Sequence, residues 1–109
     1  MNNEVSLEEM NEKTIELMQS LLGAVSPNFR MVTLEYDHGL WRFTFVLERD
    51  DPEDREEIKE VAYAFDALQE TNINYEVEIE VTDEVILMPK PSWTKRVVFR
   101  RREYHEITD

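Results

Sequence analysis

Apolar and polar side chains alternate in four segments of this 109-residue chain, and the alternation leaves each segment a single apolar face. Residues 29–36, 40–49, 75–81 and 95–103 show this period of two, which is typical of β-strands. A strand with one apolar face belongs to a sheet that is covered on one side only. The chain must therefore supply a second layer to cover that side.

Two segments with helical spacing can form this layer. The first is predicted over residues 7–22. The capping box Ser6–Glu9 marks its start, and Gly23 follows its last apolar position. A second helix begins at Asp51-Pro52, which suits an N-cap and a first helical position. Between the first two strand segments, Asp37-His38-Gly39 favours a tight hairpin turn.

The predicted order of elements is therefore α-β-β-α-β-β. We predict an α+β fold, a two-layer sandwich with two helices on one face of a four-stranded antiparallel sheet. Residues 1–109 are expected to form a single domain, because the chain is long enough for one core. The predicted core consists of Trp41, Phe43, Phe45, Ile58, Val61, Phe65, Val77, Ile79, Val97 and Phe99.

Residues 48–84 form an acidic block, in which fifteen Asp and Glu residues stand against three Arg and Lys residues. This block accounts for nearly all of the chain's formal charge of −13. An excess of negative charge repels nucleic acid and speeds association with a basic partner. A basic protein is therefore the expected partner, and direct binding to nucleic acid is not expected.

The second predicted helix carries a candidate partner-binding face. At 100° per residue, three glutamates and a tyrosine fall opposite its apolar stripe. A solvated acidic face is common on helices, but a tyrosine among carboxylates is typical of an interface anchor. Two acidic residues after the third strand are secondary candidates. The candidate partner-binding residues are Glu53, Glu56, Glu60, Tyr63, Asp83 and Glu84.

The polar faces of the last two predicted strands carry opposite charges. One offers three glutamates and the other three arginines, and a cross-strand ladder would add about 0.2–1 kcal/mol per pair if the strands are neighbours. The alternative is an exposed polar surface that docks a partner. The residues concerned are Glu76, Glu78 and Glu80 on one strand and Arg96, Arg100 and Arg102 on the other.

The connection from Thr82 to Thr94 is longer than a hairpin needs. It carries the apolar residues Ile86, Met88 and Trp93. Long ordered loops are often functional, so these residues either fold back over the core or form part of an interface.

Catalytic and metal-binding motifs are absent from the sequence. There is no cysteine, which fits a reducing cytoplasm. His38 and His105 are too few for a zinc site, and no serine lies in a nucleophile motif. No apolar run approaches the length of a membrane span. We therefore expect no catalysis, no cofactor, no metal and no membrane partner.

The chain resembles the small acidic immunity proteins of bacterial contact-dependent growth inhibition and related polymorphic toxin systems. The likeness rests on length, the lack of cysteine, the order of elements, the segment Asp51–Ile58 and the closing segment Arg96–Glu103. The resemblance implies a cytoplasmic inhibitor that binds a cognate toxin domain, often a nuclease with a basic active-site cleft. Carboxylates would then take the place of substrate phosphates.

Two functions follow from these observations. The first is an immunity protein that covers the basic cleft of a toxin, expected to be a nuclease, with an acidic surface. The alternative is an acidic protein-interaction or regulatory module unrelated to toxins, which could be homodimeric through a sheet edge or through residues 86–93.

Overall fold

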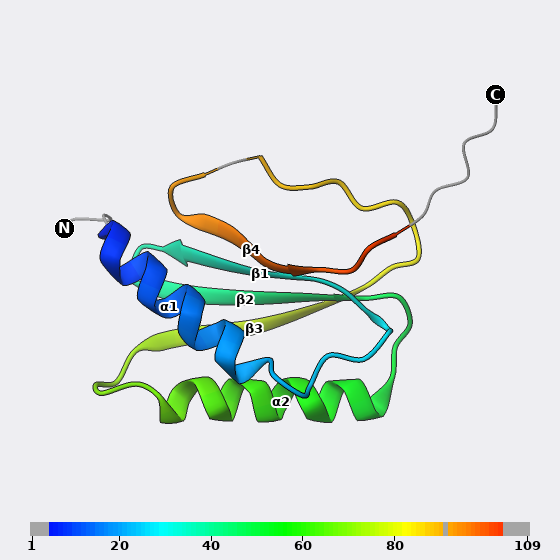
Figure 1. Ribbon diagram of the computed structural model, residues 1–109, viewed down its shortest axis with the longest axis horizontal. Helices are drawn as coiled ribbons and strands as arrows, with labels where there is room; N and C mark the ends of the chain where they lie inside the picture. Colours follow the sequence, from blue (N-terminus) through cyan, green and yellow to red (C-terminus); the bar gives the residue numbers. More distant parts are fainter. Residues whose placement is uncertain (1–4, 91, 104–109) are drawn as a thin grey trace.

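The computed structural model describes residues 5–90 and 92–103. Two helices and four strands follow one another in the predicted order α-β-β-α-β-β (Figure 1). Their bounds are α1 Leu7–Ser20, β1 Phe29–Asp37, β2 Leu40–Leu47, α2 Pro52–Ala67, β3 Asn74–Val81 and β4 Lys95–Arg100.

Strands β1 and β2 form the predicted antiparallel hairpin. His38 and Gly39 at the turn both have positive φ, 49° and 87°. A two-residue turn with two such φ values matches the right-handed twist of the flanking strands. The hairpin prediction is therefore confirmed. Gly39 is suited to its position because glycine adopts a positive φ without steric cost.

Strand β3 lies parallel to β2, so the prediction of a purely antiparallel sheet is wrong. The cause is α2, whose 16 residues extend about 24 Å at 1.5 Å per residue. This is close to the length of an eight-residue strand, about 26 Å. The helix therefore returns the chain to the end of the sheet where β2 began, and the next strand runs in the same direction.

Strand β4 occupies the opposite edge, because the order in the sheet is β3-β2-β1-β4. Residues 82–90 run back along the sheet toward it (Figure 1). The carbonyl oxygen of Thr94 then accepts a hydrogen bond from the backbone N–H of Tyr36 at 2.8 Å. Strand β4 pairs antiparallel with β1, and the register shifts between Val32 and Thr33 of β1.

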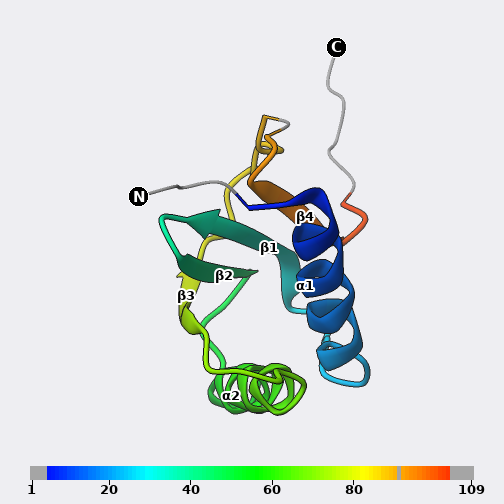
Figure 2. The ribbon, with the colours of Figure 1, turned by 90° about the vertical axis from the view of Figure 1, so that its left-hand side faces the viewer.

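Both helices cover the same face of the sheet, as predicted (Figure 2). Six of the predicted core residues are at most 3% exposed, all of them on β2 and α2. Val77, Ile79 and Phe99 are only partly buried against this core. Val97 was placed wrongly, because the irregular register of β4 packs Val98 and Phe99 together against the core instead.

Candidate partner-binding surface

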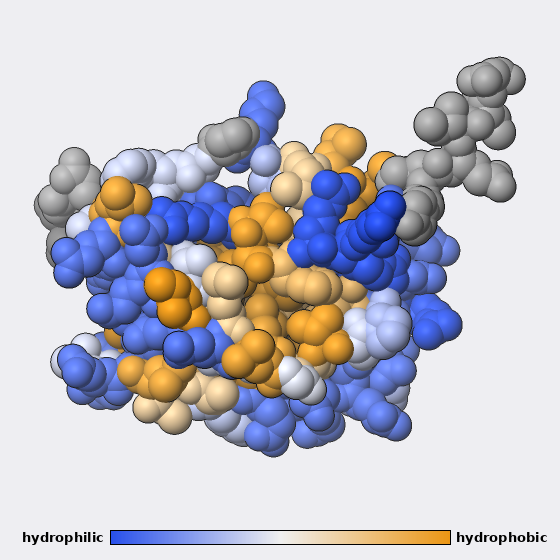
Figure 3. Space-filling view, viewed as in Figure 1, coloured by the Kyte–Doolittle hydropathy of each residue, from blue (hydrophilic) through white to orange (hydrophobic). Residues whose placement is uncertain are grey.

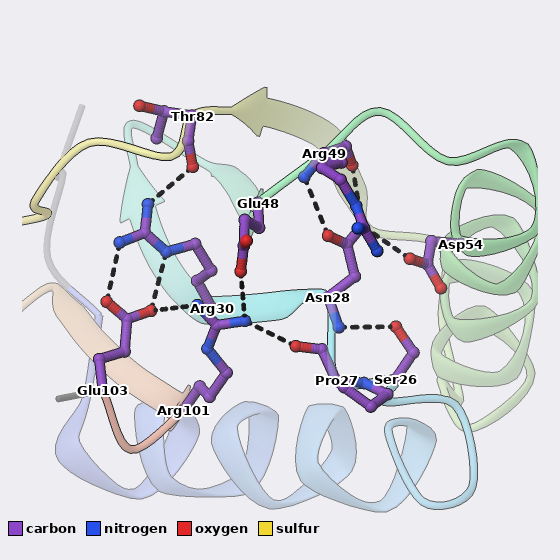
Figure 4. Close-up of polar contacts among 10 residues, drawn as sticks. All are labelled: Ser26, Pro27, Asn28, Arg30, Glu48, Arg49, Asp54, Thr82, Arg101 and Glu103. Carbon is purple, nitrogen blue, oxygen red and sulfur yellow. Dashed lines mark hydrogen bonds and ion pairs between the residues drawn. The ribbon is translucent and has the colours of Figure 1, made fainter.

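Helix α2 is held firmly at its first turn. The carboxylate of Asp51 caps the helix by accepting from the backbone N–H groups of Glu53 and Asp54, at 2.8 and 3.1 Å. The side-chain amide of Asn28 donates to the carboxylate of Asp54 at 2.9 Å, and the Asn28 side-chain oxygen accepts from the Arg49 N–H (Figure 4). These bonds tie α2 to the sheet, so its outer face is presented on a rigid element.

The four predicted residues on α2 all point away from the core. Tyr63 is 66% exposed, and Glu53, Glu56 and Glu60 are exposed as well. Glu56 forms a solvent-exposed ion pair with Lys59 at 3.3 Å. Within residues 5–90 and 92–103, Glu53 and Glu60 form no ion pair. The outer face of α2 therefore keeps free carboxylates beside an exposed aromatic ring.

The two secondary candidates lie apart from this face. Asp83 and Glu84 are exposed in the connection that follows β3. The Glu84 N–H donates to the Thr82 hydroxyl at 3.1 Å. Asp83 lines a different hollow, which it shares with Arg30 and Arg101. The structure therefore brings together the four residues of α2 but does not add Asp83 to them.

A groove of about 620 Å³ separates α2 from β3. Apolar side chains from both elements line most of it, and Arg55, Glu56, Lys59 and Tyr63 of α2 border it. This groove was not predicted from the sequence, because the alternation of residues 75–81 predicts a strand whose apolar face is fully buried. A usable signal existed, since no tight turn joins residues 75–81 to another strand. The apolar lining consists of Pro52, Ile58, Ala62, Val77 and Ile79.

The glutamates of β3 do not pair with the arginines of the last strand, because β3 and β4 are at opposite edges. The neighbouring strand β2 supplies the cation instead. Arg42 contacts Glu76 at 2.8 Å, Glu35 at 3.1 Å and Glu78 at 3.6 Å. Its pKa is raised, first by the hydrogen bond to Glu76 and then by that to Glu35. The predicted ladder is thus replaced by a cluster around one arginine.

A second ion cluster ties the segment after β4 to the sheet (Figure 4). Arg30 binds Glu103 through two hydrogen bonds of 2.8 Å, and also donates to the Thr82 carbonyl at 2.7 Å. Arg101 joins Glu103 at 3.0 Å and Glu48 at 2.9 Å. The hydrogen bond from Arg30 is the main cause that lowers the pKa of Glu103 to about 2. This cluster therefore holds the segment after β4 against the end of β1 and beside Thr82.

The face that carries α1 shows a separate apolar surface between α1 and β4, flanked by strongly hydrophilic side chains (Figure 3). Met18, Leu22 and Val25 are exposed there, beside the partly buried Val98 and Phe99. They border a shallow hollow of about 330 Å³. In the connection before β4, Trp93 is 60% exposed, although its ring N–H donates to the Val5 carbonyl at 3.1 Å.

Neither a metal-binding cluster nor a membrane-spanning helix occurs among the described residues. No group of three or more His, Cys, Asp or Glu side chains there could hold a metal ion. His105 lies outside the described residues. No described helix is both long enough and apolar enough to cross a bilayer.

Comparison with known proteins identifies the family. The sequence matches the MafI2 immunity protein family over residues 11–103, which is most of the chain. The chain belongs to the MafI2 immunity protein family. None of the curated proteins matches it in sequence.

Membership of the MafI2 family confirms the resemblance to immunity proteins of polymorphic toxin systems. The function it supports is neutralisation of a toxin, and the partner it implies is a cognate toxin. Immunity proteins generally act by binding and not by catalysis. The cognate toxin is therefore expected to contact an exposed surface of the protein.

Proposed function

We propose that this MafI2 family member acts in the cytoplasm and neutralises a basic, nucleic-acid-cleaving toxin by laying the outer face of α2 over its active-site cleft. The observation that carries the proposal is the set of exposed carboxylates around Tyr63 on a firmly capped helix. A cleft that binds phosphates is lined by cations, which carboxylates can also contact. The chain's net charge of −13 adds a long-range attraction to such a cleft.

The carboxylates are expected to act mainly on the rate of association. In the variant Glu53/Glu56/Glu60→Gln, binding to the catalytically inactive toxin domain should slow about tenfold at low salt, because steering by charge is lost. The salt dependence of the association rate should flatten as well. Stopped-flow or surface-plasmon measurements at several salt concentrations would show both effects.

A charge-matched control is available on α1. Glu8, Glu9 and Glu12 are exposed, and Glu8/Glu9/Glu12→Gln changes the net charge by the same amount. If both variants slow association equally, the overall charge matters and the α2 face does not. If neither variant changes binding at any salt concentration, the acidic-surface mechanism is wrong.

Tyr63 is expected to act mainly on dissociation. Tyr63→Ala removes an exposed ring that would be buried at the centre of the contact, and should cost upwards of ~1 kcal/mol of binding free energy through faster release. Tyr63→Phe keeps the ring and should retain most of the affinity. If Tyr63→Ala and Tyr63→Phe dissociate at the same rate, the Tyr63 ring is not part of the interface.

A further inference from the structure

The outer edge of β3 is an uninterrupted row of backbone hydrogen-bonding groups. Strand β3 pairs with β2 along its whole length without a register shift, and none of the described residues forms a strand on its other side. Beyond its end, the Thr82 N–H donates to the Leu47 carbonyl at 2.9 Å. Since backbone groups alternate in direction along a strand, the groups that point to the open edge are those of Tyr75, Val77, Ile79 and Val81.

The other edge of the sheet lacks this regularity. Strand β4 has six residues, and its pairing with β1 shifts register between Val32 and Thr33. Just before the strand, Ser92 forms an isolated antiparallel bridge with Lys95, the first residue of β4. Short and irregular edges are poor templates for a further strand. Only β3 therefore offers a long, regular edge among the described strands.

Helix α2 overhangs the β3 edge (Figure 2). It lies beyond β3, and the apolar groove of about 620 Å³ opens between them. Ile58 and Ala62 of α2 line this groove opposite Val77 and Ile79 of β3. A fifth strand hydrogen-bonded to β3 would place every second side chain in the groove and the others on the uncovered face of the sheet.

The uncovered face beside β3 is acidic. Glu76, Glu78 and Glu80 are exposed there, and Arg42 contacts only the first two of them. A second copy of this chain pairing through its own β3 would bring these rows of glutamate together, and like charges across strands are destabilising. A partner strand with basic side chains on one face and apolar side chains on the other would complement both the glutamate row and the groove.

We infer that an extended segment of the cognate toxin, with alternating apolar and basic side chains, adds to the open edge of β3 as a fifth strand. Addition of a strand to a sheet edge takes affinity from main-chain hydrogen bonds and specificity from pockets for alternate side chains. The inference rests on the proposed function only in that the toxin is the partner. The acidic face of α2 and the β3 edge meet at Glu56 and Tyr63, which border the groove, so one partner can contact both.

Amide hydrogen exchange on the ¹⁵N-labelled protein tests the inference directly, with the catalytically inactive cognate toxin domain as the probe. In the complex, exchange at Val77 and Ile79 should slow at least tenfold, because their outward N–H groups gain acceptors. The amide of Arg100 on β4 should not change. A complex that leaves Val77 and Ile79 unprotected would overturn the fifth strand and leave the proposed function standing.

A pair of variants at one position separates the main-chain bond from the side chain. Ile79→Pro removes an N–H that points away from β2, whereas Ile79→Ala shortens the side chain and keeps the N–H. We expect Ile79→Pro to bind the toxin domain at least tenfold more weakly than Ile79→Ala. Arg100→Pro, at the exposed end of β4, is the control and should bind as the unmodified protein does.

Equal affinities for the two Ile79 variants would overturn the inference. Circular dichroism establishes that each variant is folded, and where Ile79→Pro does not fold, the exchange measurement on the unmodified protein decides. A toxin domain that fails to bind the unmodified protein would overturn the proposed function together with the inference. The two failures are therefore distinguishable.

Discussion

Replacing Phe65 with alanine is expected to lower the free energy of unfolding by about 3–5 kcal/mol. Phe65 is completely buried, and its ring meets those of Phe43 and Tyr75 edge-on, with centroids 4.7 and 6.1 Å apart. Alanine would leave a cavity between α2 and the sheet and remove both ring contacts. The loss is a large part of the stability of a domain of this size.

Urea unfolding followed by circular dichroism would measure this loss. Tyr63→Ala is the matched control, because Tyr63 lies two residues away on the exposed side of the same helix. Its expected effect on stability is within about 1 kcal/mol. An unfolding curve that Phe65→Ala leaves unchanged would contradict the packing of α2 on the sheet.

Breaking the Arg30–Glu103 pair is expected to cost nearly as much. The two side chains are only 4% and 7% exposed, and Glu103→Ala would leave the Arg30 charge without its carboxylate. Removal of one partner from a buried ion pair costs about 3–5 kcal/mol. Arg30 keeps its bond to the Thr82 carbonyl, so we expect the lower end of this range. Glu76→Ala, at the half-exposed pair with Arg42, is the control and should cost less than about 1 kcal/mol.

The same pair predicts a dependence of stability on pH. The pKa of Glu103 falls from its usual value of 4.5 to about 2 in the folded protein. The folded state therefore binds this proton less readily than the unfolded state. The stabilisation is fully present above about pH 5 and is lost as the pH falls toward 2, and it amounts to about 3 kcal/mol.

Unfolding curves of the unmodified protein and of Glu103→Gln, recorded between pH 7 and pH 2, would show the effect. The two free energies of unfolding should differ at pH 7 and converge as the pH approaches 2. Parallel curves over this range would show that Glu103 does not contribute in this way.

Local structure could be predicted from the sequence because it depends on neighbouring residues. The capping residues Ser6 and Asp51 mark the starts of both helices, and their side chains accept the expected backbone hydrogen bonds. The hairpin follows from the His38-Gly39 turn, and its alternating side chains determine which residues of β2 face the helices. The outward direction of Glu53, Glu56, Glu60 and Tyr63 follows from the same helical period.

The neighbours of each strand were decided only by the tertiary structure. Alternation shows which side chains share a face, but every strand here has one apolar face, so the pattern fits several orders of strands. The length of α2 placed β3 parallel to β2, and the connection 82–94 carried β4 to the far side of β1. Glu76 therefore meets Arg42 and not an arginine of the last strand. The open edge of β3 with its groove exists because, among the described strands, no hairpin gives β3 a second neighbour.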